Sequence, residues 1–467
     1  MSEYNKVTPD FVEKLKEIIG EKYVIVDKEK LEAYKTDEET NPKYFKMPEV
    51  AVLPETAEEI AKIVKLANEY LVPITVRSAG TSLAGGAIPV FGGLVLLMER
   101  LNKILELNTD AMYIRVEAGA LTKDIQNKAE EKDLLYAGDP CSADSCQIGG
   151  NIATNAGGNR AVRYGTTRDQ VYSIEVVTPK GEIIEMGSRL EKNSTGYCLE
   201  QLVMGSEGTL GIITKATLKL KPLPPYRFDV LAIFTNENDA IDIVPKVIKS
   251  GITPTSVEFM DNSFVRSTND YCETRLPHYE DGNYVIITVE TFNEDDLDTQ
   301  MELVDELCSN NGAVEVLEAD ERVWALRRNC QESVRVISLV SITDDVVVPL
   351  NKVAETIKFV RETGEKYPFK VMTLAHAGDG NLHFVLCKCD LDDKVWEDEV
   401  HKFHKEVYEY AYAIGGRLSG EHGIGRKKLN EMATYTPFAE LEVMRSIKKA
   451  MDPNNILNPG KVFNLDN

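Results

Sequence analysis

Two short segments hold the residues whose types and spacing could do chemistry: 376–383 (HAGDGNLH) and 419–423 (SGEHG). The chain has 6 histidines, and three of them fall in these segments. Imidazole and carboxylate are the usual ligands of a catalytic divalent metal, and two histidines with one carboxylate leave positions for substrate oxygens. The glycines allow sharp turns, so that polar side chains can converge. The alternative is a polar turn whose histidines only make hydrogen bonds, but the combination favours a metal site, open to Zn, Mn or Fe(II).

A glycine-rich loop, RSAGTSLAGGA at 77–87, follows a predicted strand. Small residues let backbone N–H groups face a pyrophosphate closely, and the Ser and Thr hydroxyls add donors. The loop lacks the Gly-Lys-Ser/Thr ending of a Walker A loop and is not a Gly-x-Gly-x-x-Gly fingerprint. Taken alone, it is typical of an ordinary turn. Two further glycine-rich segments, at 138–158 and 205–213, favour a phosphate cradle over that alternative.

The glycine-rich loops are expected to be positioned by a βαβ unit and by the short strands that follow it. A strand at 50–53, a helix after a Thr56 to Glu59 capping box and a strand at 74–76 predict a βαβ unit. Further short strands are predicted at 94–98, 113–117, 174–178, 183–186 and 212–220. The proline-rich stretch KPLPP at 221–225 predicts a linker.

Two strand–helix–strand patterns follow the linker. Their predicted elements are, in order, 230–234, 238–250 and 256–260, then 284–290, 295–310 and 313–317. This repeat predicts a ferredoxin-like domain on an antiparallel sheet. Amphipathic helices at 350–366 and 395–414 flank a strand at 370–374, which leads into the first histidine segment.

The bulk composition limits the partners. A chain of 467 residues with 43% hydrophobic content predicts a globular protein of two or three domains. The formal net charge of −23 disfavours nucleic acid and anionic membranes as partners. The start lacks a signal-peptide pattern, and the apolar runs are too short to span a bilayer. The 8 cysteines include no Cys-x2-Cys pair that would indicate an iron–sulfur cluster. We expect a cytoplasmic protein with no transmembrane segment.

Together, the three glycine-rich loops and the two histidine segments resemble the FAD-linked 2-hydroxyacid dehydrogenases and oxidases, of the glycolate oxidase and D-lactate dehydrogenase type. The resemblance runs from about Val50 to Gly460. It implies an α+β fold of the vanillyl-alcohol-oxidase (PCMH/VAO) type, with a two-part FAD-binding domain, a ferredoxin-like cap domain and a C-terminal segment. The boundaries we expect are 1–47 for an N-terminal helical lead-in, 48–222 for the FAD-binding domain, 223–415 for the cap or substrate domain and 416–467 for a C-terminal segment returning to the flavin site.

The resemblance also implies roles for single residues. It gives His376, His383 and Glu421 as ligands of one divalent metal, His422 as the catalytic base and Arg327 as the ligand of the substrate carboxylate. A surface arginine paired with nearby acids is the alternative for Arg327. The residues that it assigns to FAD are Arg77, Ser78, Ala79, Gly80, Thr81, Ser82, Gly85, Gly86, Asp139, Pro140, Ser142, Gly149, Gly150, Asn151, Thr154, Asn155, Gly157, Gly158, Glu207, Gly208, Gly211, Ile212, Ile213 and Asn381.

The FAD is expected to be non-covalent. Cys141 lies in a cofactor segment and could attach a flavin, but the phosphate loop lacks the histidine that some relatives of this fold use for attachment.

The activity implied is oxidation of a small D-2-hydroxy acid, D-lactate or glycolate, to the 2-oxo acid. D-2-hydroxyglutarate or a sugar acid is the alternative, but a dicarboxylate needs a second cation, and the stretch 341–346 (SITDDV) supplies acids. A non-catalytic flavin-binding subunit is a third possibility, which the intact histidine segments disfavour. Because no second redox centre is recognisable, electrons must leave to a quinone, to oxygen or to a partner protein. The acidic composition and the absence of a predicted membrane anchor favour a soluble protein partner, and the family resemblance implies an electron-transfer flavoprotein or an iron–sulfur partner subunit.

Overall fold

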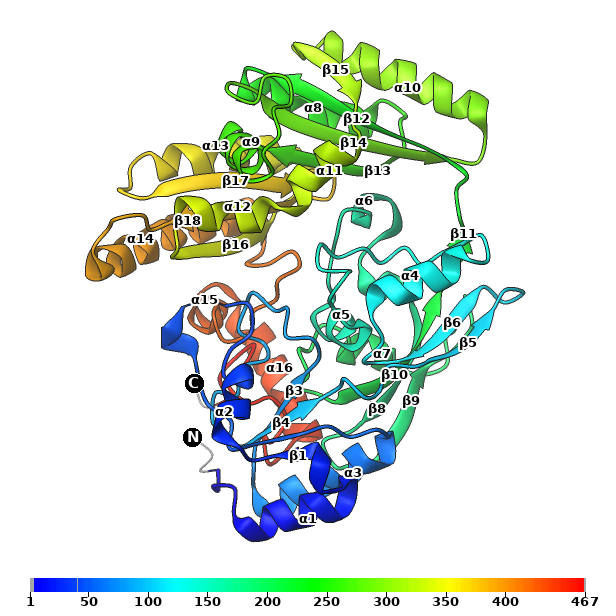
Figure 1. The fold of residues 1–467 in the computed structure, drawn as a ribbon, viewed down its shortest axis with the longest axis vertical. Coiled ribbons are helices and arrows are strands. Elements are labelled where there is room, and N and C mark those ends of the chain that lie inside the picture. The colour runs from blue at the N-terminus through cyan, green and yellow to red at the C-terminus, as the bar shows by residue number, and fades with distance from the viewer. Residues whose placement is uncertain (1–3, 40, 466–467) are drawn as a thin grey trace. The chain divides into compact units, whose positions relative to one another are not determined.

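The computed structural model describes residues 4–39 and 41–465 (Figure 1). The chain forms two compact units. The first comprises the described residues of Met1–Ala156, Thr166–Leu223 and His422–Asn467, and the second comprises Gly157–Gly165 and Pro224–Glu421. The chain therefore passes from the first unit to the second inside the stretch 221–225 that predicts a linker, and it returns between the adjacent residues Glu421 and His422.

One sheet of the first unit contains the expected βαβ pattern. Its strands, in spatial order, are β1 (Val24–Ile25), β2 (Val50–Val52), β4 (Leu94–Leu97) and β3 (Ile74–Arg77). Strands β2, β4 and β3 are parallel, and helix α3 (Ala57–Tyr70) connects β2 to β3. Thr56 caps this helix, because its hydroxyl accepts a hydrogen bond from the Glu59 N–H at 3.1 Å. The capped helix predicted from the sequence is confirmed.

The residues before the first predicted strand form part of this unit. Helix α1 (Pro9–Ile19) begins after Thr8, whose side chain accepts a hydrogen bond from the Phe11 N–H, and the short helix α2 (Lys28–Leu31) follows β1. Phe11 and Leu15 are fully buried in the core that also contains the apolar face of α3. An amphipathic helix needs a partner for its apolar face, so the segment expected as a lead-in packs against the body of the unit.

A second, antiparallel sheet completes the first unit. Its strands, in spatial order, are β5 (Ile104–Asn108), β6 (Tyr113–Glu117), β10 (Ile212–Lys219), β8 (Val171–Val177) and β9 (Ile183–Gly187). The remaining elements are α4 (Thr122–Glu130), β7 (Leu134–Leu135), α5 (Ile148–Thr154), α7 (Leu199–Val203), β11 (Lys221–Pro222), α15 (Leu429–Tyr435) and α16 (Phe438–Met451). The two-part α+β arrangement expected for the flavin domain is present.

The second unit contains the predicted ferredoxin-like repeat. Its elements are β12 (Tyr226–Phe234), α8 (Glu237–Lys249), β13 (Pro254–Met260), β14 (Asn283–Thr291), α10 (Glu294–Ser309) and β15 (Glu315–Glu318). These strands lie in the order β15-β12-β14-β13, so the first strand of each pattern occupies the centre, as in a ferredoxin-like sheet.

Three more strands extend this sheet beyond β13. They are β17 (Lys370–His376), β18 (Asn381–Cys387) and β16 (Ser341–Val347), and all of them pair antiparallel. The helices of the unit are α6 (Ala161–Tyr164), α9 (Asn262–Tyr271), α11 (Glu321–Arg328), α12 (Cys330–Ile337), α13 (Val353–Gly364) and α14 (Asp393–Ala413). Helices α13 and α14 match the two predicted amphipathic helices. The sequence predicts β17 but not its pairing with the ferredoxin-like strands, since that pairing joins residues more than a hundred positions apart.

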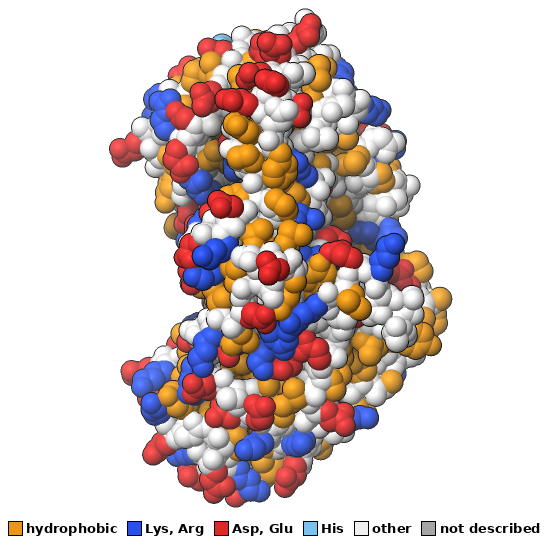
Figure 2. All heavy atoms as spheres, turned by 90° about the vertical axis from the view of Figure 1, so that its right-hand side faces the viewer, with side chains coloured by type: hydrophobic (Ala, Val, Ile, Leu, Met, Phe, Trp, Pro, Cys, Tyr) orange, Lys and Arg blue, Asp and Glu red, His pale blue; other side chains and the backbone are white. Residues whose placement is uncertain are grey.

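The surface carries both signs of charge. Figure 2 shows acidic and basic side chains interspersed over the face drawn, although acids outnumber bases 76 to 53 in the whole sequence. Among the described residues, no helix combines the length and the apolar character needed to cross a membrane.

Candidate metal and flavin sites

Five polar side chains lie on one face of the seven-stranded sheet because the strand register brings them there. The register pairs Glu258 with His376, His376 with Asn381, and His383 with Asp345. Paired residues point to the same face of a sheet, and so do residues two apart along one strand, such as Asn381 and His383. Each of the five is at most 5% exposed, so the face is a buried polar patch.

The predicted metal ligands converge on this face. His376 and His383 lie on β17 and β18, and Glu421 lies in an irregular segment that follows α14. The Glu421 Oε1 atom is 3.5 Å from His376 Nε2 and 3.2 Å from His383 Nε2. The two imidazole rings are 5.1 Å apart and nearly perpendicular. Two imidazole nitrogens and a carboxylate therefore face a common point.

This donor set fits a divalent cation. One ligand atom from each residue lies within 4.8 Å of the others, and small side-chain movements would bring all three to the bond lengths of about 2.0–2.2 Å typical of zinc. Burial alone would raise the pKa of Glu421, but the His376 and His383 imidazoles hold it well below its usual range. A site with three candidate protein ligands would leave positions open for substrate oxygens.

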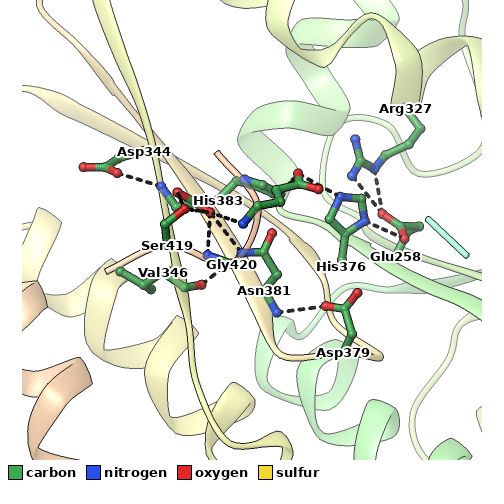
Figure 3. A network of polar contacts seen from close by, with 12 residues as sticks. Glu258, Arg327, Asp344, Val346, His376, Asp379, Asn381, His383, Ser419 and Gly420 are labelled. Carbon is green, nitrogen blue, oxygen red and sulfur yellow. Dashed lines mark hydrogen bonds and ion pairs between the residues drawn. The ribbon is translucent and has the colours of Figure 1, made fainter. Parts of the chain in front are cut away.

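Glu258 links His376 to Arg327. Its Oε1 atom is 2.9 Å from His376 Nδ1, and its Oε2 atom accepts from Arg327 Nε at 3.0 Å and Nη2 at 2.8 Å (Figure 3). Burial would raise the pKa of Glu258, but the imidazole and the guanidinium hold it below its usual value. A carboxylate on Nδ1 fixes the tautomer that leaves Nε2 for a metal. Arg327 is 5% exposed, so the alternative of a surface arginine paired with helix acids is wrong.

A second carboxylate, that of Asp345, organises the segment that carries Glu421. It accepts hydrogen bonds from the Ser419 hydroxyl at 3.0 Å, the Gly420 N–H at 2.7 Å and the Glu421 N–H at 2.9 Å. The Asn381 amide also donates to it, at 3.3 Å. A Cβ on Gly420 would lie 2.0 Å from the Asn381 amide nitrogen, so the backbone can approach this closely only with glycine.

Glu207 holds the residues that follow His422. Its Oε1 and Oε2 atoms accept from the N–H groups of Ile424 and Gly425, each at 2.8 Å. The backbone bends from Gly420 to His422, and Gly423 has a φ of +81°, which favours glycine. The turn that the two glycines were expected to allow is therefore present. Glu207, expected near the flavin, uses both oxygens inside the first unit to hold this turn.

The glycine-rich loop after β3 has the features of a phosphate cradle. The N–H groups of Gly80, Thr81 and Ser82 donate no hydrogen bond within the described part of the chain. Arg77 lies beneath the loop, donates to the Thr36 carbonyl at 2.6 Å and would meet a Cβ on Gly80 at 2.2 Å. Backbone N–H groups beside a guanidinium suit a pyrophosphate, so the loop fits FAD. The other predicted loop residues, Ser78, Ala79, Gly85 and Gly86, lie in the same loop.

The second cofactor segment meets this loop. A Cβ on Gly150, at the start of α5, would lie 3.2 Å from the Ser78 Cβ atom. Three of the expected residues make structural hydrogen bonds: Asn151 donates to Thr122, Asn155 accepts from Thr166, and Asp139 accepts from Gln126. The remaining predicted residues of the first unit are Pro140 and Ser142 in the loop before α5, Gly149 and Thr154 in α5, Gly208 and Gly211 before β10, and Ile212 and Ile213 in β10.

Three residues expected to bind FAD belong to the second unit. Gly157 and Gly158 lie in the excursion 157–165, and a Cβ on Gly157 would be 2.6 Å from Glu421 Oε2. Asn381 lies on the buried polar face beside Asp345. Gly157 and Asn381 therefore neighbour the predicted metal ligands in this structure, and their assignment to FAD stays a prediction.

Sequence reasoning missed Glu258 and Asp345. Glu258 is the one acid in a mostly apolar strand, and this was the available signal for it, whereas Asp345 lies in a strand of mixed composition. From the sequence alone, the acids of the stretch 341–346 bear only on possible substrate contacts. In the structure Asp345 holds the Glu421 segment, while Asp344 faces helix α14, where Tyr408 donates to it and His404 Nε2 is 3.3 Å away.

The chain is similar over its whole length to known flavoproteins. Residues 223–462 match the family described as FAD linked oxidases, C-terminal domain, and residues 48–187 match the FAD binding domain. A D-lactate dehydrogenase of Anaerostipes hadrus is 38% identical, and the match covers 98% of each chain. Glycolate oxidase subunit GlcD of Bacillus subtilis is 36% identical over 92% of each chain.

Solved structures show the same fold at lower identity. p-Cresol methylhydroxylase with substrate bound has a TM-score of 0.82 at 18% identity, with 99% of both chains covered. An alkyldihydroxyacetonephosphate synthase has a TM-score of 0.77 at 22% identity, covering 98% of this chain and 87% of that one. The fold is therefore of the PCMH/VAO type. With both of its domains matched and close relatives along its full length, the chain belongs to the FAD-linked oxidase family of flavoprotein oxidoreductases.

Proposed function

We propose that this protein is an FAD-dependent, metal-assisted dehydrogenase that oxidises D-lactate or glycolate to the 2-oxo acid. The observation that carries the proposal is the cluster of two buried histidines, His376 and His383, with the partly exposed Glu421, in a chain that also has an FAD-binding domain. The names of the relatives, D-lactate dehydrogenase and glycolate oxidase, support the substrate class. A 2-hydroxy acid has adjacent carboxylate and hydroxyl oxygens, which suit the open positions of such a cluster.

The chain's own residues have separate roles in this proposal. Arg327 holds the substrate carboxylate in a charge-assisted pair, sharing its guanidinium with Glu258. The His422 imidazole accepts the proton of the substrate hydroxyl as a general base. When bound, a divalent cation at the cluster supplies Lewis acidity that lowers the pKa of that hydroxyl, and FAD supplies the hydride acceptor.

A monocarboxylate is favoured over D-2-hydroxyglutarate. A second substrate carboxylate needs a second cationic contact. The stretch 341–346 instead offers Asp344 and Asp345, which are both buried and accept hydrogen bonds from other residues. Neither acid would attract a dicarboxylate.

We propose a soluble protein acceptor for the electrons and a cytoplasmic location. An electron-transfer flavoprotein or an iron–sulfur partner subunit fits, because the cysteine spacing of this chain suits no cluster of its own. The relative from Bacillus subtilis is itself named as a subunit.

Anaerobic flavin reduction tests the proposed function. D-Lactate or glycolate should bleach the flavin, chelation should abolish the bleaching, and added metal should restore it, because the proton is released only when the hydroxyl pKa falls. L-Lactate and D-2-hydroxyglutarate serve as comparison substrates. Bleaching by D-2-hydroxyglutarate alone would favour the alternative substrate, and no bleaching by any acid would indicate a flavin-binding subunit.

Heat denaturation tests the cofactor assignment. The protein should be yellow and release FAD into the supernatant, because the loop around Gly80 offers N–H donors to a pyrophosphate. Chromatography of the released flavin gives the result. FMN in the supernatant, or flavin that stays with the precipitate, would contradict dissociable FAD.

Substitutions of the adjacent residues Glu421 and His422 should have different effects, one on metal content and the other on the rate of flavin reduction. Glu421→Gln should lower metal occupancy together with activity, because a divalent cation held by two neutral imidazoles is stabilised most by an anionic third ligand. His422→Ala should retain metal and FAD but slow flavin reduction by about 10²–10⁴-fold, the usual effect of losing a general base. Metal analysis beside rapid-mixing kinetics measures both. Loss of metal in His422→Ala with retention in Glu421→Gln would reverse the two assignments.

Arg327→Lys should raise KM for the hydroxy acid roughly tenfold, because an ammonium cannot reproduce the paired hydrogen bonds of a guanidinium. Arg328→Lys is the matched control, since Arg328 is exposed and pairs with Glu321. Steady-state kinetics and metal content are measured together. A loss of metal with unchanged KM would mean that Arg327 serves only Glu258 and His376.

A further inference from the structure

The Asp345 carboxylate is fully buried and is surrounded by donors from the segment that carries Glu421. The hydroxyl of Ser419 and two successive backbone N–H groups, those of Gly420 and Glu421, all point at it. Just before these residues, Arg417 pairs with Val347 of β16 through two backbone hydrogen bonds of 2.8 and 3.2 Å. Strand β16 therefore both aligns the segment and supplies the carboxylate over which it folds.

The three metal ligands differ in how their backbone is held. His376 and His383 lie on paired strands, whose ladder hydrogen bonds fix their positions. Glu421 lies in a bend outside any helix or strand. Its own N–H donates to Asp345, so this carboxylate holds the backbone of the ligand itself. A buried anion that accepts backbone N–H groups makes strong hydrogen bonds.

The neighbouring acid provides a contrast. Asp344 is equally buried but lies on the opposite face of β16, where its partners are Tyr408 and His404 on α14. The backbone hydrogen bond that it accepts comes from Asp345, its neighbour on the same strand. Asp344 therefore serves packing on the helix side, and the two acids can be compared directly.

We propose that Asp345 is a positioning residue that sets the affinity of the metal centre by holding Glu421 in its ligating conformation. The proposal rests on the proposed metal site and adds to it the residue that orders its third ligand. Partners of metal ligands commonly change metal affinity by about 10- to 100-fold when they are removed.

The test is Zn²⁺ binding by FAD-loaded protein from which metal has been removed, titrated in competition with a chromophoric chelator. Asp345→Ala should weaken Zn²⁺ binding by about 10- to 100-fold while FAD content stays at the wild-type level. Asp345→Asn should weaken it less, because the amide oxygen can replace one carboxylate oxygen without its charge. Asp344→Ala is the matched control and should lower the unfolding temperature yet keep wild-type Zn²⁺ affinity.

Glu421→Gln separates failure of this inference from failure of the metal site. If wild type and Glu421→Gln bind Zn²⁺ equally, the metal centre itself is wrong. If Glu421→Gln loses Zn²⁺ but both Asp345 variants bind it like wild type, the positioning role is wrong. If Asp345→Ala does not fold, wild-type Zn²⁺ affinity in Asp345→Asn still overturns the positioning role. The role is also overturned if Asp344→Ala loses as much Zn²⁺ affinity as Asp345→Ala does.

Discussion

The register of four antiparallel strands, β13, β17, β18 and β16, is the constraint on which the candidate metal centre depends. It aligns Glu258, His376, Asn381, His383 and Asp345 across one face of the sheet. A slip of one residue in any pairing would turn that strand's polar side chains to the other face. The sheet thus carries both the histidines and the carboxylates that orient their surroundings.

Burying so many polar groups requires that each have a partner. An isolated charge is costly to remove from water, and breaking a buried pair is strongly destabilising. Glu258 is balanced by Arg327 and His376, and Asp345 by hydroxyl, amide and backbone donors. Glu421 faces two imidazoles, an arrangement that a divalent cation would complete. The same contacts that make burial tolerable also hold the candidate ligands in place.

Short-range sequence patterns were enough to predict several elements and part of the candidate site. The cap at Thr56, the ferredoxin-like repeat and the two histidines of the 376–383 segment could all be predicted from nearby residues. Glu258 could not, because its role depends on the pairing of β13 with β17, which lie far apart in the sequence. The neighbours of Gly157 were also unpredictable, since a short excursion carries it into the second unit.

The acids at 344 and 345 show the same limit. Their negative charge indicates that they would not bind the second carboxylate of a dicarboxylate substrate. Only the fold shows that these adjacent residues point to opposite faces of the strand and contact different partners. Backbone hydrogen bonds to a carboxylate leave no trace in the sequence of the donor segment, apart from the glycine that permits the approach.

In the proposed site, His376, His383 and Glu421 hold one divalent cation. Anomalous diffraction from crystals, recorded above and below the absorption edge of the metal found by elemental analysis, tests it most directly. We expect one anomalous peak at about 2.0–2.2 Å from His376 Nε2, His383 Nε2 and a Glu421 oxygen, with Glu258 remaining on His376 Nδ1. No peak at this cluster in protein that contains stoichiometric metal, or a peak ligated by other residues, would contradict it.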